Sequence, residues 1–538
     1  MPTRLNVSMM LVSSLLALPV IVVFASWSTP QLQIWQHLAQ TVLSDYVFNS
    51  LILAFSVGIG CLIIGTTLAW CVVKYEFWGR RLLQWLFILP LAMPAYIIAY
   101  TYTGLLDFAG PVQTALRDYF QLSYGQYWFP EIRSLGGAVS VMVLVLYPYV
   151  YILARTAFTE QSRNLKEASG SLGVSSFNYF RKVAWPLARP ALLTGSALAM
   201  MEAFADYGTV QYFGVSTFTT GIFRTWFGLD NQLAASQLAA LLCTFVLVVL
   251  LLEKWSRRQI RYYQSGQSHQ PIMRKKLSLS RSVLMFLLCL TVPFFGFILP
   301  VGQLLIWALS YTEMGLDSAF FTLMWNSFWL AAVTACLVVL IALLYGFAKR
   351  LSPTPMMTWQ VQGVSLGYAI PGTVIAVGVL VPLSWADHQF NQITALLFNL
   401  TPGLIFSGTV FALILAYTVR FLAVALQSVE AGLGRVTPAM DEAARCLGAS
   451  PRQVLWRVHL PIMRASILSA ALLVFVDVLK ELPATLILRP FNFDTLAVSA
   501  FQYASDERLI DAALPALAIV LAGLLPVILL SRAMDKHA

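Results

Sequence analysis

Charged residues are scarce in this sequence. Only 11% of its 538 residues are Asp, Glu, Lys or Arg, whereas 59% are hydrophobic. Because a soluble globular chain has about 25% charged residues, this chain cannot cover its own surface with charge in water. We therefore expect an integral membrane protein in a lipid bilayer. Basic loops on one side of the bilayer explain the net charge of +10, so no nucleic-acid partner is expected.

Metal-binding, phosphate-binding and catalytic motifs are also lacking. The six cysteines lie mostly in apolar runs without a CxxC pair, and the five histidines are dispersed, which argues against the usual zinc and disulfide patterns. No G-x-x-x-x-G-K-[ST] loop is present, so the chain is not expected to bind ATP in the usual way. No HExxH or GxSxG motif supports a membrane-embedded enzyme. We expect no cofactor bound by this chain.

Apolar runs long enough to cross a bilayer, about 20 residues each, occur about twelve times. They form two sets of six around a polar, basic stretch. We expect an all-α membrane protein with a first six-helix half over 1–262, a cytoplasmic linker over 263–280 and a second six-helix half over 281–538. The first run is interpreted as a retained span because it is long and no clear A-x-A cleavage site follows it. The runs centre on 10–28, 48–73, 82–106, 136–155, 190–212, 233–252, 282–310, 326–348, 358–382, 403–425, 466–488 and 512–531.

Lys and Arg are distributed unequally between the predicted loops. With the N-terminus placed inside, cytoplasmic segments hold 28 of the 34 basic residues and outer loops hold five, while Lys480 lies within a span. Cytoplasmic loops of membrane proteins carry such an excess. The distribution predicts a multi-pass protein with both termini in the cytoplasm.

The chain also contains a tandem repeat. The stretch "EASGSLG" beginning at Glu167 matches "EAARCLG" beginning at Glu442, so adding 275 to a position in the first half gives its counterpart. Each half has an even number of spans, so the two halves lie the same way up, related by a pseudo-two-fold axis along the membrane normal. A transport path on that axis is expected. Further pairs keep this offset or one close to it: Pro186 with Pro461, Phe218 with Phe493, Asn49 with Asn326, and Pro94 with Pro371.

The longest cytoplasmic loops fall between the fourth and fifth spans of each half. Both follow the layout E-A-x-x-x-L-G-x(12)-P, which suits a short helix, a glycine turn and a second short helix. Gly173 and Gly448 stand where a helix ends with a left-handed residue, and Ser175 or Ser450 then caps the next helix. A single amphipathic loop of this kind could lie on the lipid surface. Its duplication favours a docking surface presented twice to one partner.

These loops resemble the EAA loops of permease subunits in ABC importers that use a binding protein. The resemblance implies the type I ABC importer permease fold, a bacterial inner-membrane location and a coupling helix in each loop. It also implies an ABC ATPase dimer on the cytoplasmic face, which binds ATP and Mg, and a periplasmic substrate-binding protein. Ser169 and Gly170 depart from the usual helix formers in the first loop. The residues that carry over as ATPase-coupling positions are Glu167, Ala168, Gly173, Pro186, Glu442, Ala443, Ala444, Gly448 and Pro461.

The fifth predicted span of each half contains a pair of acids. Glu202 and Asp206 lie four residues apart, and their counterparts in the second half are Asp477 and Glu481. Residues at i and i+4 share one face of a helix, and a charge near the bilayer centre costs about 3 kcal/mol on insertion scales. Oxygen ligands suit hard cations, so the four acids are candidates for transient contacts with a passing multivalent cation along the path. Alternatively, they pair with Lys480, Arg224 or Arg489, or cap helix ends.

The segments that follow these acids resemble those of ferric-iron permeases with fused, duplicated halves. That resemblance implies that a periplasmic binding protein delivers Fe(III) to outer loops such as Val215–Trp226 and Arg489–Ala504. The cation that the four acids contact transiently is then expected to be Fe³⁺. Thiamine permeases share the fused layout, so thiamine or another small cationic solute stays the alternative substrate. A gradient-driven secondary transporter is the alternative of another class, but it has no reason to keep paired EAA loops.

Overall fold

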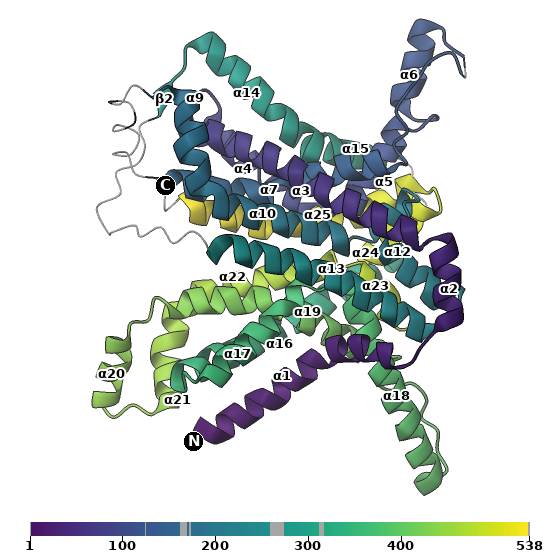
Figure 1. Ribbon diagram of the computed structural model, residues 1–538, viewed down its shortest axis with the longest axis vertical. Coiled ribbons are helices and arrows are strands. Elements are labelled where there is room, and N and C mark those ends of the chain that lie inside the picture. Colours follow the sequence, from purple (N-terminus) through teal and green to yellow (C-terminus); the bar gives the residue numbers. More distant parts are fainter. Residues whose placement is uncertain are drawn as a thin grey trace. The chain divides into compact units, whose positions relative to one another are not determined.

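The computed structural model describes residues 2–123, 125–161, 169, 171, 174–258, 274–310 and 317–535 (Figure 1). Helices make up nearly all of the regular structure in these ranges. The described strands are β1 (Tyr75–Glu76) and β2 (Lys275–Lys276), which pair in parallel. The all-α fold class predicted from the sequence is confirmed.

Two compact units divide the chain, and each takes segments from both sequence halves. Unit 1 comprises Met1–His37, Gly221–Cys243 and Met314–Ser499, and unit 2 comprises Leu38–Thr220, Thr244–Glu313 and Ala500–Ala538. Boundaries between the units fall within helices α2 (Leu32–Thr41), α12 (Phe218–Phe223), α13 (Gln232–Arg258) and α24 (Leu496–Ser505).

The remaining elements of unit 2 follow the chain in this order: α3 (Leu43–Lys74), β1, α4 (Arg80–Leu86), η2 (Leu89–Ala92), α5 (Ala95–Leu106), α6 (Pro111–Phe120), α7 (Leu135–Thr159), α9 (Ser176–Tyr179), η3 (Phe180–Ala184), α10 (Trp185–Ala205), α11 (Gly208–Tyr212), β2, α14 (Leu279–Pro293), η5 (Phe294–Ile298), α15 (Leu299–Leu309) and α25 (Leu509–Asp535). Those of unit 1 are α1 (Pro2–Ala25), η1 (Ser26–Ser28), η4 (Arg224–Gly228), α16 (Ser318–Leu351), α17 (Pro355–Val364), η6 (Ser365–Ala369), α18 (Gly372–Phe398), α19 (Val410–Leu433), α20 (Pro438–Cys446), α21 (Pro451–Val454), η7 (Leu455–His459), α22 (Leu460–Leu479) and α23 (Pro483–Leu488).

Small residues bring the helices of unit 2 close together. A Cβ atom added at Gly65 of α3 would lie 2.8 Å from the backbone nitrogen of Tyr151 on α7, and one added at Gly195 of α10 would lie 2.7 Å from Cα of Val150. The hydroxyl of Ser196 donates to the carbonyl of Gly58 across 3.0 Å. In membranes, such small residues let backbones approach where apolar side chains gain nothing over lipid.

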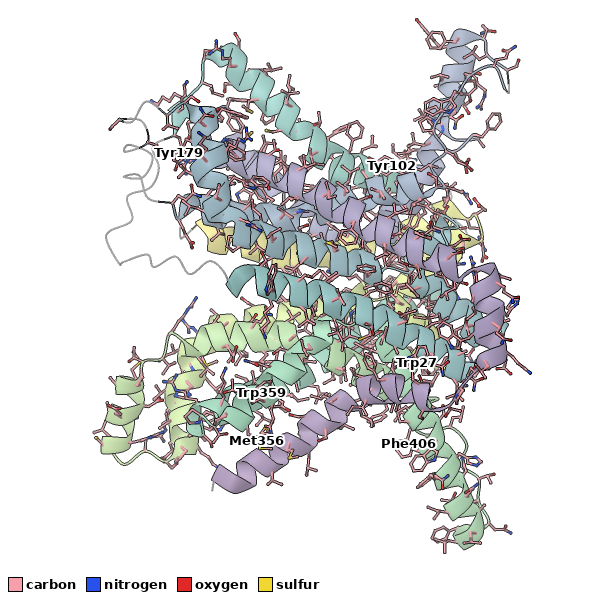
Figure 2. All side chains as sticks on the ribbon, in the orientation of Figure 1. Trp27, Tyr102, Tyr179, Met356, Trp359 and Phe406 are labelled. Carbon is pink, nitrogen blue, oxygen red and sulfur yellow. The ribbon has the colours of Figure 1, made fainter. Side chains whose placement is uncertain are left out.

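Unit 1 packs α16, α19 and α22 together, and α1 lies against α16, α17, α18 and α19. The hydroxyls of Ser13 on α1 and Tyr345 on α16 are 2.7 Å apart. Apolar side chains on the outer face of α17 are exposed, with Trp359 74% and Met356 47% accessible, and they point away from the ribbon (Figure 2). An apolar exposed surface of this kind suits lipid rather than water.

Among the described residues, nine helices are long and apolar enough to cross a membrane, or eleven if two sharply bent helix pairs each form one span. The bent pairs join Arg80–Ala92 with Ala95–Phe120 and Pro355–Ala369 with Gly372–Phe398. The sequence predicted about twelve spans. The predicted run at 190–212 has no counterpart among these spans; it falls on α10, which ends at Ala205, and on α11 after it.

The 28 basic residues counted above as cytoplasmic include Arg420, which lies within a candidate span. Arg420 belongs to α19, a candidate span over Val410–Leu433, and is buried there. The assignment of Arg420 to a loop is wrong because the helix begins later and ends later than the apolar run at 403–425 indicated. Without Arg420 the basic residues still favour the same side by a wide margin.

Candidate functional site

The fifth span of the first half breaks at Asp206. Helix α10 ends at Ala205, and Asp206 is extended, with φ −68° and ψ 134°. Its carboxylate accepts hydrogen bonds from the backbone N–H groups of Thr209 (3.0 Å) and Val210 (3.2 Å) and from the hydroxyl of Thr209 (3.0 Å). An Asp side chain offers the backbone this alternative to continuing a helix. Asp206 therefore caps the next helix, α11.

The fifth span of the second half breaks at the equivalent position. Helix α22 ends at Leu479, and α23 begins at Pro483, which cannot donate a backbone hydrogen bond. The Oε1 atom of Glu481 accepts from Nη1 of Arg420 (2.8 Å) and from the backbone N–H of Ala484 (3.2 Å). Both halves thus place a carboxylate at the break of the fifth span, at matching positions of the repeat.

These breaks correct the predicted geometry of the acid pairs. Glu202 lies in the last turn of α10 and Asp477 in the last turn of α22, whereas Asp206 and Glu481 lie beyond the helix ends. The prediction that each pair shares one helix face is therefore wrong. Asp477 forms an ion pair with Lys480 across 2.7 Å, as the alternative interpretation of the acids anticipated.

A resident metal site is not visible in the part of the chain that the structure describes. No three His, Cys, Asp or Glu side chains there lie close enough together to hold a metal ion. Transient contacts of a passing cation with Glu202, Asp206, Asp477 or Glu481 stay a prediction.

The repeated Asn-Ser pairs hold the segment after each break. The side chain of Asn49 donates to the carbonyl of Ser216 (2.9 Å), and the hydroxyl of Ser50 accepts from the backbone N–H of Phe218 (3.1 Å). In the second half the side chain of Asn326 donates to the carbonyl of Asp494 (3.2 Å). There the hydroxyl of Ser327 accepts from the backbone N–H of Leu496 (2.8 Å). The sequence identified these pairs as repeated but not their role.

The same bonds correct one repeat assignment. Because Ser50 and Ser327 hold equivalent N–H groups, Phe218 corresponds to Leu496 rather than to Phe493. The second half therefore contains three extra residues after Glu481. They belong to a turn in which Arg489 pairs with Asp494 and Phe491 is 97% exposed. Most of Val215–Trp226, by contrast, is buried in the fold.

The second EAA loop folds as the sequence predicted. Helix α20 is followed by Gly448 with φ +80°, a left-handed conformation that favours glycine. Ser450 and Gln453 then form a reciprocal capping box at the start of α21. Glu442 and Ala443 are exposed on α20 and Ala444 is half-buried. The short helix, glycine turn and second helix are confirmed for this loop.

The first EAA loop is only partly described. Glu167, Ala168 and Gly173 lie outside the described residues. Pro186 stands at the second position of α10, as Pro461 does in α22. Both prolines keep the predicted equivalence.

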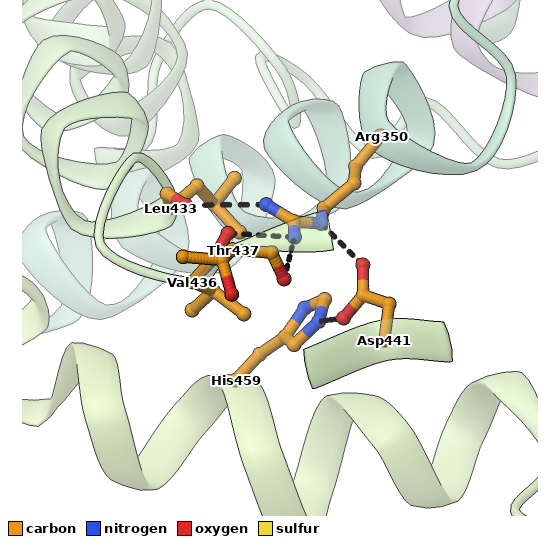
Figure 3. A network of polar contacts seen from close by, with 6 residues as sticks. All are labelled: Arg350, Leu433, Val436, Thr437, Asp441 and His459. Atoms are coloured by element: carbon orange, nitrogen blue, oxygen red, sulfur yellow. Dashed lines mark hydrogen bonds and ion pairs between the residues drawn. The ribbon is translucent and has the colours of Figure 1, made fainter. Parts of the chain in front are cut away.

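A buried polar network anchors the second EAA loop (Figure 3). Nε of Arg350 lies 2.7 Å from one carboxylate oxygen of Asp441, and Nε2 of His459 lies 2.7 Å from the other. Burial acts to raise the pKa of Asp441, but the hydrogen bonds from His459 and Arg350 hold it below its ordinary value of 3.8. Sequence patterns did not indicate this network, since its members are far apart along the chain. The other N–H groups of the guanidinium donate to the carbonyls of Leu433, Val436 and Thr437.

A π-helical turn joins each EAA loop to its fifth span. The turns are η3, before α10, and η7, before α22, and they begin at Phe180 and Leu455, which are matching positions of the repeat. In each, the N–H of the following residue, Trp185 or Leu460, bonds to the carbonyl five residues earlier. A proline comes next in both halves and lacks an N–H, so the regular α-helical bond is missing there. Such π turns frequently mark functional positions in helices.

One protein family matches two regions of this chain. The family, "Binding-protein-dependent transport system inner membrane component", matches residues 61–262 and 363–537. The chain belongs to this family. The two matched regions agree with the duplication and contain both EAA loops.

Several relatives align with most of this chain. It is 26% identical over 500 residues to the Fe(3+)-transport system permease protein FbpB 2 of Haemophilus influenzae, covering 91% of this chain and 90% of that protein. It is 23% identical over 488 residues to the ferric transport system permease protein FbpB of Actinobacillus pleuropneumoniae, covering 87% and 68%. The probable sulfate transport system permease protein cysT of Nephroselmis olivacea is 34% identical but covers only 28% of this chain.

Proposed function

We propose that this protein is the permease subunit of an ATP-driven importer of ferric iron. The observation that carries the proposal is the full-length similarity to a ferric-iron permease, which covers 91% of this chain and 90% of that protein. The sulfate permease covers 28% of the chain, so that local similarity does not argue for an anion. A periplasmic binding protein delivers the iron, and both termini lie in the cytoplasm.

The second EAA loop is suited to dock on a partner ATPase. Its tip presents Leu447, which is 89% exposed, and Met440, which is 43% exposed. Asp441 of α20 is buried, and its carboxylate is bonded to Arg350 of α16 and His459 of η7. A rigid loop with an exposed apolar tip can transmit a push to the helices that hold it. The duplicated loop in the first half implies a second, equivalent ATPase subunit.

The mechanism follows from the order of the elements. ATP closes the two ATPase subunits, which move the coupling segments Glu167–Phe180 and Glu442–Trp456. The π turns pass this movement to α10 and α22. Because each fifth span breaks at Asp206 or Glu481, its outer part need not follow as a rigid rod. The path then alternates between inward-open and outward-open states.

The acids at the breaks contribute to this path in two ways. Asp206 and Glu481 hold the broken spans together by capping α11 and α23. Glu202 and Asp477, in the last turns of α10 and α22, are the other candidates for transient contact with Fe³⁺. Weak contacts of this kind permit release, which tight binding would prevent.

Radiolabelled ferric-iron uptake in cells tests the function. We expect uptake that excess thiamine leaves unchanged, that stops when ATP is depleted and that survives loss of the proton gradient. Absence of iron uptake, or competition by thiamine, would overturn the iron assignment in favour of a small cationic solute. Uptake that follows the gradient instead would favour a secondary transporter.

Two amide variants separate transport from structure. Glu202→Gln with Asp477→Asn should lower iron uptake at least tenfold while membrane insertion and ATPase binding persist. Asp118→Asn, an exposed acid on α6, is the matched control and should transport normally. Normal uptake in the double variant would show that the acids are not on the path, without affecting the permease assignment.

A further inference from the structure

Four arginines from distant parts of the chain meet at one end of unit 2. Arg80 and Arg81 begin α4, Arg155 lies in the last turns of α7, and Arg274 directly precedes β2. The pairing of β1 with β2 holds Arg274 beside the start of α4. We call these four residues the basic cluster. Burial lowers the pKa of the Arg274 guanidinium most. The positive charges of Arg80, Arg155 and Arg81 lower that pKa further, so these residues repel Arg274.

One carboxylate serves two arginines of the basic cluster. Oε2 of Glu76 lies 3.2 Å from Nε of Arg80 and 4.0 Å from Nε of Arg274. Arg80 is only 6% exposed; its Nε pairs with Glu76 without forming a hydrogen bond, and its Nη1 atom makes no hydrogen bond to the described residues. A buried guanidinium without sufficient compensation is destabilising. An anion at this position would supply the missing charge and acceptors.

Two cations at the corresponding end of unit 1 are compensated in a different way. There Lys349 pairs with Glu430 across 2.6 Å and Arg350 with Asp441 across 2.7 Å, so each of these cations has its own carboxylate. Arg80 and Arg274 of the basic cluster instead share the carboxylate of Glu76.

An apolar surface adjoins the basic cluster. Trp78, which is 64% exposed, lies between β1 and α4, and its ring meets Phe286 of α14 edge to face, with the centroids 4.7 Å apart. Its backbone N–H donates to the hydroxyl of Ser282 across 2.6 Å, which fixes α14 beside the cluster. Tryptophan is typical of the membrane interface. The outward side chains of α4 and α14 that are more than half exposed are Leu82, Leu279, Leu284, Leu287 and Leu288.

We propose that the basic cluster binds the phosphate group of an anionic phospholipid whose acyl chains lie along the exposed leucines of α14. Arginine recognises phosphate through paired, charge-assisted hydrogen bonds, and basic pockets between membrane helices bind lipid head groups. Free phosphate would satisfy the same guanidinium groups. The adjoining leucines and Trp78 favour the lipid as its source, because a free ion would leave that apolar surface unused. The bound lipid joins the linker end at β2 to α4 and α7.

Lipid titration of the purified full-length chain in neutral detergent tests the proposal. Phosphatidylglycerol should raise the thermal unfolding midpoint at much lower concentration than phosphatidylcholine. Each basic residue near the surface adds to the attraction of an anionic lipid, so Arg80→Gln with Arg274→Gln should weaken phosphatidylglycerol binding at least tenfold. Because Arg80 is buried, Arg81→Gln with Arg274→Gln, both exposed, tests the same site with less risk to folding.

The controls distinguish the outcomes. Arg435→Gln with Arg445→Gln removes two exposed charges from unit 1 and should bind phosphatidylglycerol as the parent does. Equal responses to the two lipids, or equal losses in the cluster and control variants, would overturn the site. If inorganic phosphate at the same concentration raises the midpoint as much as phosphatidylglycerol does, the lipid source is wrong and the ligand is soluble phosphate.

Discussion

Arg420 and Glu481 bring opposite charges together inside unit 1. The two residues are 8% and 6% exposed, and Glu481 also caps α23. The repeat identified Glu481 as the counterpart of Asp206, but it did not indicate that Arg420 would be the ion-pair partner of Glu481. The first-half acid at the same position, Asp206, is instead satisfied by Thr209 and Val210. Equivalent acids thus solve the same burial problem with different neighbours.

Replacing Arg420 with Met should destabilise the protein strongly. Removing one partner of a buried ion pair leaves an uncompensated charge, which costs about 3–5 kcal/mol. The double variant Arg420→Met with Glu481→Gln should recover part of this loss, because the remaining amide is neutral and still accepts from Ala484. Thermal unfolding in detergent measures both. A double variant no more stable than the single one would contradict the structural role of the pair.

Asp441 should stabilise the second EAA loop at all pH values above its ordinary pKa. Its pKa is lowered in the folded protein, so its contribution is complete above 3.8 and is lost as pH falls through the folded value. Asp441→Asn should remove about 1.5–3 kcal/mol, the usual contribution of hydrogen bonds to a charged group. The ratio of the hydrogen-exchange rate in the variant to that in the parent, over residues 433–450, should therefore be raised by the same factor at pH 7 and at pH 5. Arg445→Gln, exposed on the same helix, should leave the exchange unchanged.

At the scale of elements, periodicity predicted most helices but not their interruptions. The apolar run at 190–212 predicts one span, yet Asp206 competes for backbone donors and ends α10 at Ala205. The prolines in the EAA loops were visible, but their effect on the preceding turn depends on packing, so the π turns were not predicted. The turn at Gly448 was predicted because it requires a local conformation that few residues adopt.

Gly448 offers a test of the loop as an element. A Cβ atom added there meets no other atom within 4 Å, so a substitution acts through the backbone at φ +80° alone. Gly448→Ala should cost about 1–2 kcal/mol of local stability and uncouple ATP hydrolysis from uptake. Gly448→Asn should be nearer to the parent, because asparagine tolerates this conformation. Equal coupling in all three proteins, measured as iron taken up per ATP hydrolysed in proteoliposomes, would remove Gly448 from the mechanism.

At the scale of the molecule, the duplication was evident in the sequence, but the division into units was not. The repeat predicts halves at 1–262 and 281–538, whereas helix packing groups α1 with α16–α19 and groups α14, α15 and α25 with α3, α5 and α7. A repeat shows which segments share an ancestor. It does not show which segments of one half pack against helices of the other half, since apolar helix faces look alike in sequence.

Separate expression of the two halves tests this division. If each unit needs segments from both halves, residues 1–262 alone and residues 281–538 alone should accumulate poorly in membranes, because helices such as α16 lose partners such as the Ser13–Tyr345 bond. Co-expression of both pieces should restore accumulation, and an affinity tag on one piece should retain the other. Ser13→Ala, which removes one hydrogen bond worth about 1 kcal/mol, should weaken that recovery only slightly. Either half accumulating normally by itself would show that the six-helix half, and not the mixed unit, is what folds.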